Sequence, residues 1–196
     1  MVAHQPTYKL PALLLASGAL TATTPPFHSL EKSIHTSLTK NGVKHTQVDD
    51  FLQYSPAITF YALDVFGVKS KHSLKNKFLI HVVSEALATG MVTPMKRIIH
   101  RERPDGSDFH SFPSGHTTTA FVGAEILHQE YGHISPWISI AGYTTAAATG
   151  YLRMQNNAHW LGDVIAGAGM GILSARLGYW VVRQIGKEAK RQRVTF

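Results

Sequence analysis

Apolar residues along the chain gather in six segments, separated by proline, glycine and charged residues. The segments lack the alternating β-branched pattern and hairpin turns of β-strands, and a polar stretch with helical spacing connects the first two. No repeat or long linker divides the chain, so we predict one all-α domain over residues 1–196, with a basic tail at 183–196. The segments are Leu10–Thr24, Tyr54–Val68, Phe78–Met95, Thr117–Leu127, Pro136–Leu152 and Val164–Val182.

The distribution of charge favours helices that cross a membrane, although no segment is an uninterrupted apolar run of about 18 residues. With six crossings and the N-terminus inside, the lysine-rich loop 69–77 and the basic tail lie on the inner face, as the positive-inside rule requires. The basic cluster 96–103 then lies on the outer face and needs a functional explanation. A soluble helical bundle is the alternative.

Two further features bear on a membrane location. Charged residues inside the segments must face the interior of the bundle, and these are Asp64, Glu85 and Arg176. Small residues should let helices approach closely, and these are Gly142, Gly150, Gly167, Gly169 and Gly171.

The composition narrows the chemistry. The 196 residues include no cysteine, which excludes a disulfide scaffold, a thiol nucleophile and a cysteine-ligated metal site. The net charge of +7 indicates an anionic partner, but no nucleic-acid-binding motif accompanies the basic residues, so we expect no nucleic-acid partner. Leu10–Ala22, behind Lys9, also fits the core of a signal peptide, which leaves the cleavage of this segment open.

The first candidate motif is a basic stretch that ends in proline. Lys96 and Arg103 are seven residues apart, so on a helix they lie two turns apart on nearly one face. Pro104 should close that helix directly after Arg103. A lysine and an arginine on one side suit the oxygens of a phosphate group, whereas a solvated basic helix end is the simpler interpretation of this motif alone.

The second motif is a tight turn, Pro113-Ser114-Gly115-His116, which predicts the start of a helix. Such a turn can direct the Ser114 hydroxyl, successive backbone N–H groups and a helix N-terminus at an anion. His116 can donate a proton to a leaving oxygen. A helix-capping serine beside an incidental histidine is the alternative.

The third motif is Arg153-x5-His159-x3-Asp163. On a helix, His159 and Asp163 share a face, so the carboxylate can hold one nitrogen of the imidazole and leave the other free as a nucleophile. A surface His–Asp pair is the alternative. The 12 histidines also suggest zinc, but no His-Glu-x-x-His pattern is present, so we expect no metal and no cofactor.

In this order and with these spacings, Lys-x6-Arg-Pro, Pro-Ser-Gly-His and Arg-x5-His-x3-Asp resemble the signature of the type 2 phosphatidic acid phosphatase superfamily. That superfamily also includes bacterial acid phosphatases and vanadium haloperoxidases. The motifs cover Lys96–Asp163. The resemblance implies a six-helix bundle and, in a bacterial membrane-type member, a site on the periplasmic face of the inner membrane. The charge pattern places the 96–103 cluster on that same outer face.

The resemblance also implies a role for each motif residue. His159 corresponds to the nucleophile that forms a phosphohistidine, Asp163 to the carboxylate that orients it, and His116 to the acid that protonates the leaving alcohol. Leu152 stands where the family commonly has serine, which removes at most a minor polar contact. Three cations would neutralise the phosphate oxygens without a metal. The residues expected to bind phosphate are Lys96, Arg103, Ser114, Gly115 and Arg153.

The expected function is hydrolysis of a phosphorylated lipid, with no obligate protein partner. Candidate substrates are phosphatidic acid, phosphatidylglycerol phosphate, an isoprenyl diphosphate such as undecaprenyl diphosphate, and a lipid A phosphate. A mean hydropathy of −0.05 keeps open a soluble periplasmic acid phosphatase that acts on small phosphomonoesters. A vanadium haloperoxidase is disfavoured because these enzymes usually have a larger scaffold. A protein that only binds lipid phosphate is also disfavoured, because it would need the cations but not His159 or His116.

Six residues near the motifs keep open roles. His100 and His110 are expected to be polar loop residues, with a contribution to the pocket as the alternative. Asp105 and Asp108 are candidates to pair with the arginines. Trp137 and Trp160 suit either a membrane interface or packing.

Overall fold

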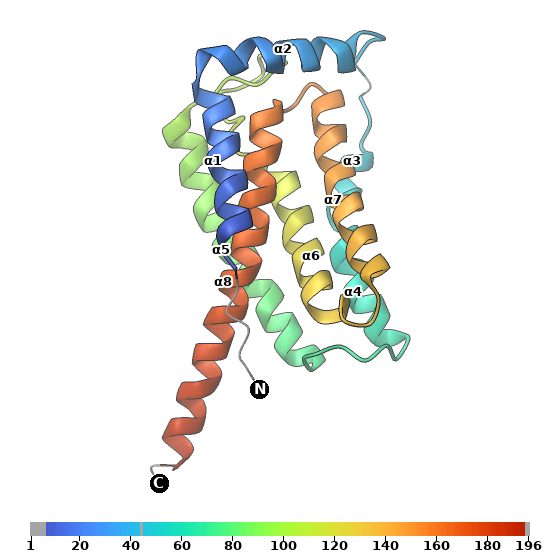
Figure 1. Cartoon of the computed structure of the whole chain (residues 1–196), viewed down its shortest axis with the longest axis vertical. Coiled ribbons are helices and arrows are strands. Elements are labelled where there is room, and N and C mark those ends of the chain that lie inside the picture. The colour runs from blue at the N-terminus through green and yellow to red at the C-terminus, as the bar shows by residue number, and fades with distance from the viewer. Residues whose placement is uncertain (1–6, 44, 195–196) are drawn as a thin grey trace.

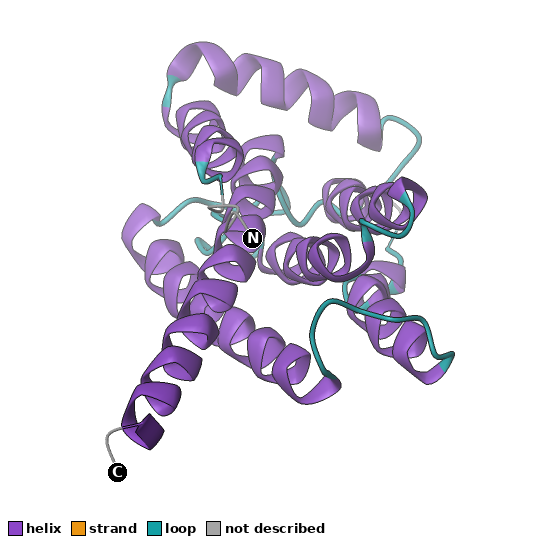
Figure 2. Ribbon diagram, turned by 60° about the horizontal axis from the view of Figure 1, so that its bottom comes forward, coloured by secondary structure: helices purple, strands orange, loops and turns teal. Residues whose placement is uncertain are grey.

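Each of the six predicted apolar segments forms a helix, which confirms the all-α prediction. The structure is a computed structural model that describes residues 7–43 and 45–194, with side chains described up to residue 188. All regular secondary structure in this part of the chain is helical (Figure 2). The elements are α1 (Lys9–Thr23), α2 (Pro25–Thr39), α3 (Val48–Leu52), α4 (Ser55–Val65), α5 (Leu74–Ile99), α6 (Gly115–Tyr131), α7 (Pro136–Gln155) and α8 (Leu161–Val194).

The helices of the six apolar segments run up and down one bundle, and α2 lies across one of its ends (Figure 1). This end, called the α2 end below, also carries the last turn of α7 and the first turn of α8. The opposite end carries the loop between α4 and α5 and the C-terminal part of α8. The short α3 packs against α7. α5 and α8 each extend between the two ends, so each of these helices places residues at both ends of the bundle.

Helix α8 is the central element, and it contacts α1, α5 and α6. Its glycines allow these contacts. A Cβ atom at Gly167 would lie 2.7 Å from the carbonyl oxygen of Ser114, directly before α6, and one at Gly169 would lie 2.9 Å from the backbone nitrogen of Leu15 in α1. A Cβ atom at Gly171 would collide with the carbonyl oxygen of Thr118.

The close-packing role predicted for five glycines agrees with their surroundings. Besides the three on α8, Gly142 and Gly150 of α7 also lie where a Cβ atom would be closer than 3.0 Å to a side chain of another helix. Small residues at helix contacts let backbones approach each other, which is typical of packing in lipid and also occurs in water-soluble bundles. The glycines therefore set the spacing between α8 and its neighbours.

Two of the three charged residues predicted to face the bundle interior form buried ion pairs. The Lys77 ammonium is fully buried and lies 2.5 Å from Asp64 Oδ2, and the Tyr131 hydroxyl donates to Asp64 Oδ1 at 2.7 Å. Arg176 Nε donates to Oε1 of the fully buried Glu125 at 2.9 Å. Each charge is compensated inside the protein, as burial requires.

Apolar surface is exposed on the long helices. α5 over Leu74–Ile99 and α8 over Leu161–Glu188 each contain a window with a mean hydropathy of 1.3 and are long enough to cross a membrane. Only 22% of the window on α5 is buried within the protein, compared with 56% on α8. Phe78, Leu79 and Val82 are among the exposed residues of α5. The third charged residue, Glu85, is half-buried on α5 and lies 3.8 Å from His81 Nε2.

Replacing Gly171 by alanine should destabilise the protein by about 1–3 kcal/mol, because the added methyl group must push α6 away from α8. Gly90→Ala is the matched control: a Cβ atom there meets nothing within 4 Å, so this variant should keep its stability or gain up to about 1 kcal/mol of helix propensity. Thermal unfolding in detergent measures both. Equal melting temperatures for Gly171→Ala and the parent protein would show that the contact is not tight.

Candidate active site

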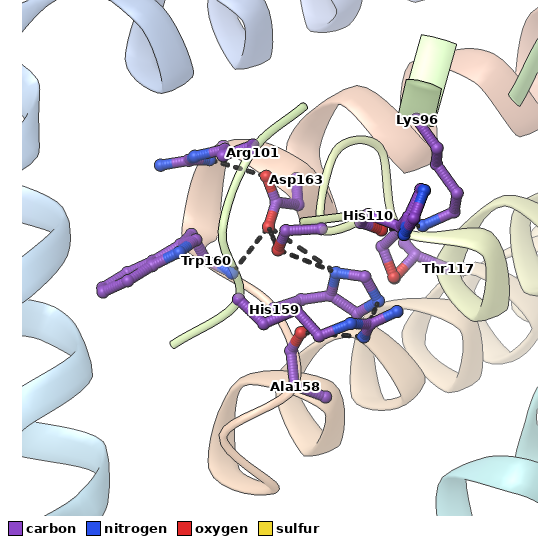
Figure 3. Close-up of polar contacts among 12 residues, drawn as sticks. Lys96, Arg101, His110, Thr117, Ala158, His159, Trp160 and Asp163 are labelled. Atoms are coloured by element: carbon purple, nitrogen blue, oxygen red, sulfur yellow. Dashed lines mark hydrogen bonds and ion pairs between the residues drawn. The ribbon is translucent and has the colours of Figure 1, made fainter. Parts of the chain in front are cut away.

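The predicted pair of His159 and Asp163 forms at the α2 end, but not on one continuous helix. α8 begins at Leu161, so His159 lies in the preceding turn and Asp163 in the first helical turn. Asp163 Oδ2 accepts the Trp160 backbone N–H at 2.9 Å and lies 3.5 Å from His159 Nδ1 (Figure 3). The prediction of a helix through His159 is wrong because the carboxylate caps the helix that starts after it, where negative charge is favoured.

Asp163 has two further partners that the sequence did not reveal. Arg101 Nη1 donates to its Oδ1 at 2.6 Å, and the buried Ser111 hydroxyl donates to its Oδ2 at 2.5 Å. Figure 3 shows the carboxylate between Arg101 and the His159 ring. The carboxylate is fully buried, and these donors compensate its charge.

Arg101 also connects Asp163 to α2. Its Nη2 forms an ion pair with Glu31, a buried residue of α2 whose Oε1 accepts the Gly162 N–H at 2.7 Å. No sequence signal marked Glu31, because it lies in a polar segment far from the motifs. Arg101 lies inside the first motif, but its sequence position alone did not separate it from the other basic residues there.

The second nitrogen of His159 faces a cation. Arg103 Nη1 lies 3.4 Å from His159 Nε2 and donates to the Ala158 carbonyl oxygen at 3.0 Å. Arg103 Nε donates to Asp108 Oδ1 at 2.9 Å, so the predicted pairing of Asp108 with an arginine is present. The imidazole thus has a carboxylate at one nitrogen and a guanidinium at the other.

Lys96 and Arg103 are brought together differently from the prediction. α5 ends at Ile99, and His100 adopts the left-handed conformation (φ 48°), so Arg103 lies in the following loop and not on the helix. Lys96 Nζ donates to the His110 carbonyl oxygen at 2.5 Å. The charge of Lys96 interacts with the charges of Arg103, Arg153 and Asp163. The helix prediction was wrong after Ile99, but both cations approach the same place.

His116 and Arg153 form a second group, which α3 holds. His116 Nε2 lies 2.8 Å from Asp50 Oδ1, and Arg153 Nη1 donates to Asp49 Oδ2 at 2.7 Å. Asp49 is buried and also accepts from the Asn156 amide at 2.8 Å. The Arg153 charge acts on both His116 and Lys96, so it links the two groups. Neither aspartate was singled out by the motifs.

Ser114 and Gly115 lie where α6 begins, against the first turn of α8. The Ser114 N–H donates to the Asp163 carbonyl oxygen at 3.0 Å, and its hydroxyl accepts from Thr117 Oγ1 at 2.9 Å. Ser114 therefore connects the start of α6 to the first turn of α8. A Cβ atom at Gly115 would meet nothing within 4 Å, so the backbone there is open to an approaching group.

The burial of His159 determines its protonation state. Desolvation lowers the pKa of this imidazole to about 4; the Asp163 carboxylate counteracts the shift, and the Lys96 and Arg103 charges add to it. The ring is therefore neutral over the physiological pH range, with a lone pair available on the nitrogen away from its proton.

The remaining candidates lie around this centre. The His100 ring packs against Phe109 with centroids 4.8 Å apart, and the side chain of Asp105 accepts the Ser107 N–H at 2.9 Å. The Trp160 indole N–H donates to the Glu102 carbonyl oxygen at 2.9 Å, whereas Trp137 is exposed on α7. Among the residues that the structure describes, no three His, Asp or Glu side chains are grouped to hold a metal ion.

Replacing Arg101 by glutamine should destabilise the fold by about 3–5 kcal/mol, because Glu31 and Asp163 would keep buried negative charges without their shared cation. Arg97→Gln is the control, since Arg97 is an exposed arginine near the end of α5, just before the loop that carries Arg101. Thermal unfolding measures the difference between the two variants. An unchanged melting temperature for Arg101→Gln would contradict the assigned role of the bridge.

Comparison with known proteins identifies relatives of this architecture. A curated relative, the lipid A 1-phosphatase of Porphyromonas gingivalis, is 45% identical over 141 residues, which are 71% of this chain and 32% of that protein. The chain thus spans about a third of the length of that relative.

Two solved structures share the fold. The crystal structure of Aquifex aeolicus LpxE matches with a TM-score of 0.57 and 23% identity, over 76% of this chain and 94% of the other. A transmembrane PAP2-type phosphatidylglycerolphosphate phosphatase from Bacillus subtilis matches with a TM-score of 0.60 and 18% identity, over 91% and 96%. The family model described as the PAP2 superfamily matches residues 77–187, a range that contains all three motifs. The chain therefore belongs to the PAP2 superfamily.

Proposed function

We propose that the protein is a metal-independent phosphatase that hydrolyses a phosphorylated lipid through a phosphohistidine intermediate. The observation that carries this proposal is the buried pair of His159 and Asp163 beside a group of cations. The pair supplies an oriented nucleophile, and the cations compensate the charge of a phosphate. Family membership and the lipid A 1-phosphatase relative support the same conclusion.

In the proposed reaction the two nitrogens of His159 have different tasks. Nδ1 lies 3.5 Å from Asp163 Oδ2, so it carries the proton and the carboxylate fixes the ring. The lone pair of Nε2 attacks phosphorus, and the bond from phosphorus to the leaving oxygen breaks. The leaving oxygen takes its proton from His116. A water molecule, deprotonated by His116, then attacks phosphorus, the P–N bond breaks, and the electron pair returns to Nε2.

The phosphate group would be held by Lys96, Arg103 and Arg153, with Ser114 and the backbone of Gly115 at the start of α6. Arg103 already lies 3.4 Å from His159 Nε2, so the cation and the attacking nitrogen would meet the same phosphate. Arg153 Nε is buried and has no hydrogen-bond partner among the described residues, so it can donate to a phosphate oxygen. These donors would neutralise the charge of the phosphate oxygens during phosphoryl transfer, which is the task a metal performs in other phosphatases.

We propose a location in a bacterial inner membrane, with six crossings and the site on the periplasmic face. The lysine-rich loop before α5 and the C-terminal part of α8 lie at the end of the bundle opposite α2 and the start of α8, which fits the positive-inside rule (Figure 1). The exposed apolar residues of α5 support contact with lipid. Activity that stays in the soluble fraction without detergent would instead identify a soluble periplasmic acid phosphatase.

Among the candidate lipids, a lipid A 1-phosphate is the preferred substrate class because of the Porphyromonas gingivalis relative. Phosphate release from a panel of lipid phosphates, lipid diphosphates and water-soluble monoesters tests this choice. The panel should include phosphatidic acid, phosphatidylglycerol phosphate and undecaprenyl diphosphate. A preference for the water-soluble monoesters would overturn the lipid assignment.

Replacing His159 by alanine should lower phosphate release by about 10³-fold or more, because the variant lacks the nitrogen that would form the covalent intermediate. His133→Ala is the control, since His133 is exposed between α6 and α7 and should leave turnover unchanged. Both variants are assayed with EDTA present, and thermal unfolding confirms that they are folded. Turnover by folded His159→Ala would exclude this nucleophile, and loss of parent activity in EDTA would indicate a metal-dependent enzyme.

The pH dependence of kcat/KM should show an acidic limb well below pH 6.5. Protonation of His159 removes the attacking lone pair, and burial lowers the pKa of this group to about 4, so activity should be lost only as the pH falls towards that value. The substrate's own second ionisation, near pH 6, is measured separately and divided out. If an acidic limb at pH 6.5 or above remains after the substrate's ionisation is divided out, the lowered pKa of His159 is contradicted.

A further inference from the structure

The far end of the bundle from His159 contains a cavity of about 790 Å³ that the proposed reaction does not use. Its wall is formed by the start of α5 with the loop before it, the last turns of α6, and the C-terminal part of α8. Its lining includes the apolar residues Ile80, Trp180 and Val182. The rest of the lining is mostly polar and includes basic residues. The cavity therefore offers both apolar and cationic contacts.

Buried carboxylates behind the cavity are already compensated. The fully buried Glu130 accepts from the His72 ring at 2.8 Å, from the His72 backbone N–H at 2.9 Å and from the Tyr179 hydroxyl at 2.6 Å. Glu125 is held by Arg176 and by the Tyr143 hydroxyl at 2.5 Å. These carboxylates do not need a cation from the cavity, and they do not neutralise the cations on its rim.

Three of the cations that line the cavity are free to bind an anion. Lys71, Arg183 and Lys187 line the cavity and are exposed, and in the described part of the chain none of them forms an ion pair with a carboxylate. Arg176 also lines the cavity, but its charge is balanced by Glu125. These cations would therefore attract an anion, and the apolar lining residues would hold a hydrocarbon chain.

The distance from the candidate active site matches the thickness of a membrane. On α5, Asn76 at the cavity and Lys96 at the site are 20 residues apart, which corresponds to about 30 Å of helix. On α8, Asp163 and Arg183 are also 20 residues apart. The hydrocarbon core of a bilayer is about 30 Å thick, so the cavity and the site would lie at opposite membrane surfaces.

We propose that this cavity binds an anionic phospholipid of the leaflet opposite the active site. The phosphate of the headgroup lies among Lys71, Arg183 and Lys187, and the first part of an acyl chain packs on Trp180 and Val182. The inner leaflet, which carries the negative surface potential, is the leaflet that the proposed topology places there. The lipid joins the start of α5 to the end of α8 and would stabilise the contact between them.

Native mass spectrometry of the full chain, released from micelles that contain phosphatidylglycerol or phosphatidylcholine, tests the proposal. Lys71→Gln/Lys187→Gln should retain phosphatidylglycerol about 25-fold more weakly, roughly fivefold for each cation removed. Lys69→Gln/Lys75→Gln is the matched control, because it removes the same charge from exposed lysines at the same end that do not line the cavity. The control should retain the lipid as the parent protein does.

Three further results decide the outcome. Phosphatidylcholine should be retained weakly by all variants. Phosphate release at the distant site should be unchanged in Lys71→Gln/Lys187→Gln, and this activity also shows that the variant is folded. Equal loss of phosphatidylglycerol in both double variants would indicate only a diffuse surface charge and would overturn the cavity as the site. Displacement of the lipid by 10-fold excess inorganic phosphate would overturn a phospholipid as the occupant.

Discussion

The negative charge of Asp163 is fully buried, and the arrangement of the candidate site depends on keeping that charge compensated. Its donors come from two parts of the chain: Arg101 and Ser111 from the loop after α5, and the backbone N–H of Trp160 before α8. Arg101 extends the network to Glu31 on α2. Since an unpaired buried carboxylate costs several kcal/mol, the same contacts that orient His159 also hold α2 and the loop on the end of the bundle.

Helix spacing determines whether this network can form at all. Gly167 and Gly171 bring α8 against the start of α6, and there the Ser114 N–H reaches the Asp163 carbonyl oxygen. The second motif is thereby joined to the third through backbone contacts, independently of any ligand. The packing of α8 against α6 thus controls the relative positions of the motif residues. A change of a few tenths of an ångström in the distance between these helices would shift His159 relative to the second motif.

Sequence patterns predicted the six long helices, the interior position of Asp64 and Arg176, and the residues of three motifs that the structure brings to one end. They failed where local structure depends on distant partners. His159 and Arg103 were placed on helices because their spacing is helical, yet both lie in loops whose course is set by contacts with Asp163 and Asp108. Glu31, Asp49 and Asp50 could not be found from spacing, because their partners are 66 to 131 residues away, a separation over which only the folded chain defines proximity.

Two of the three proposed phosphate-binding cations already have carboxylate partners within the protein, Arg103 with Asp108 and Arg153 with Asp49. A phosphate bound at these cations, as proposed, would exchange one ion pair for another, and its binding free energy would be the difference between the two. A dianion would gain more from this exchange than a monoanion, so the internal carboxylates would act as competitors that favour doubly charged phosphate groups. The same competition would weaken the binding of every phosphate group at the site, the inorganic phosphate formed by hydrolysis included.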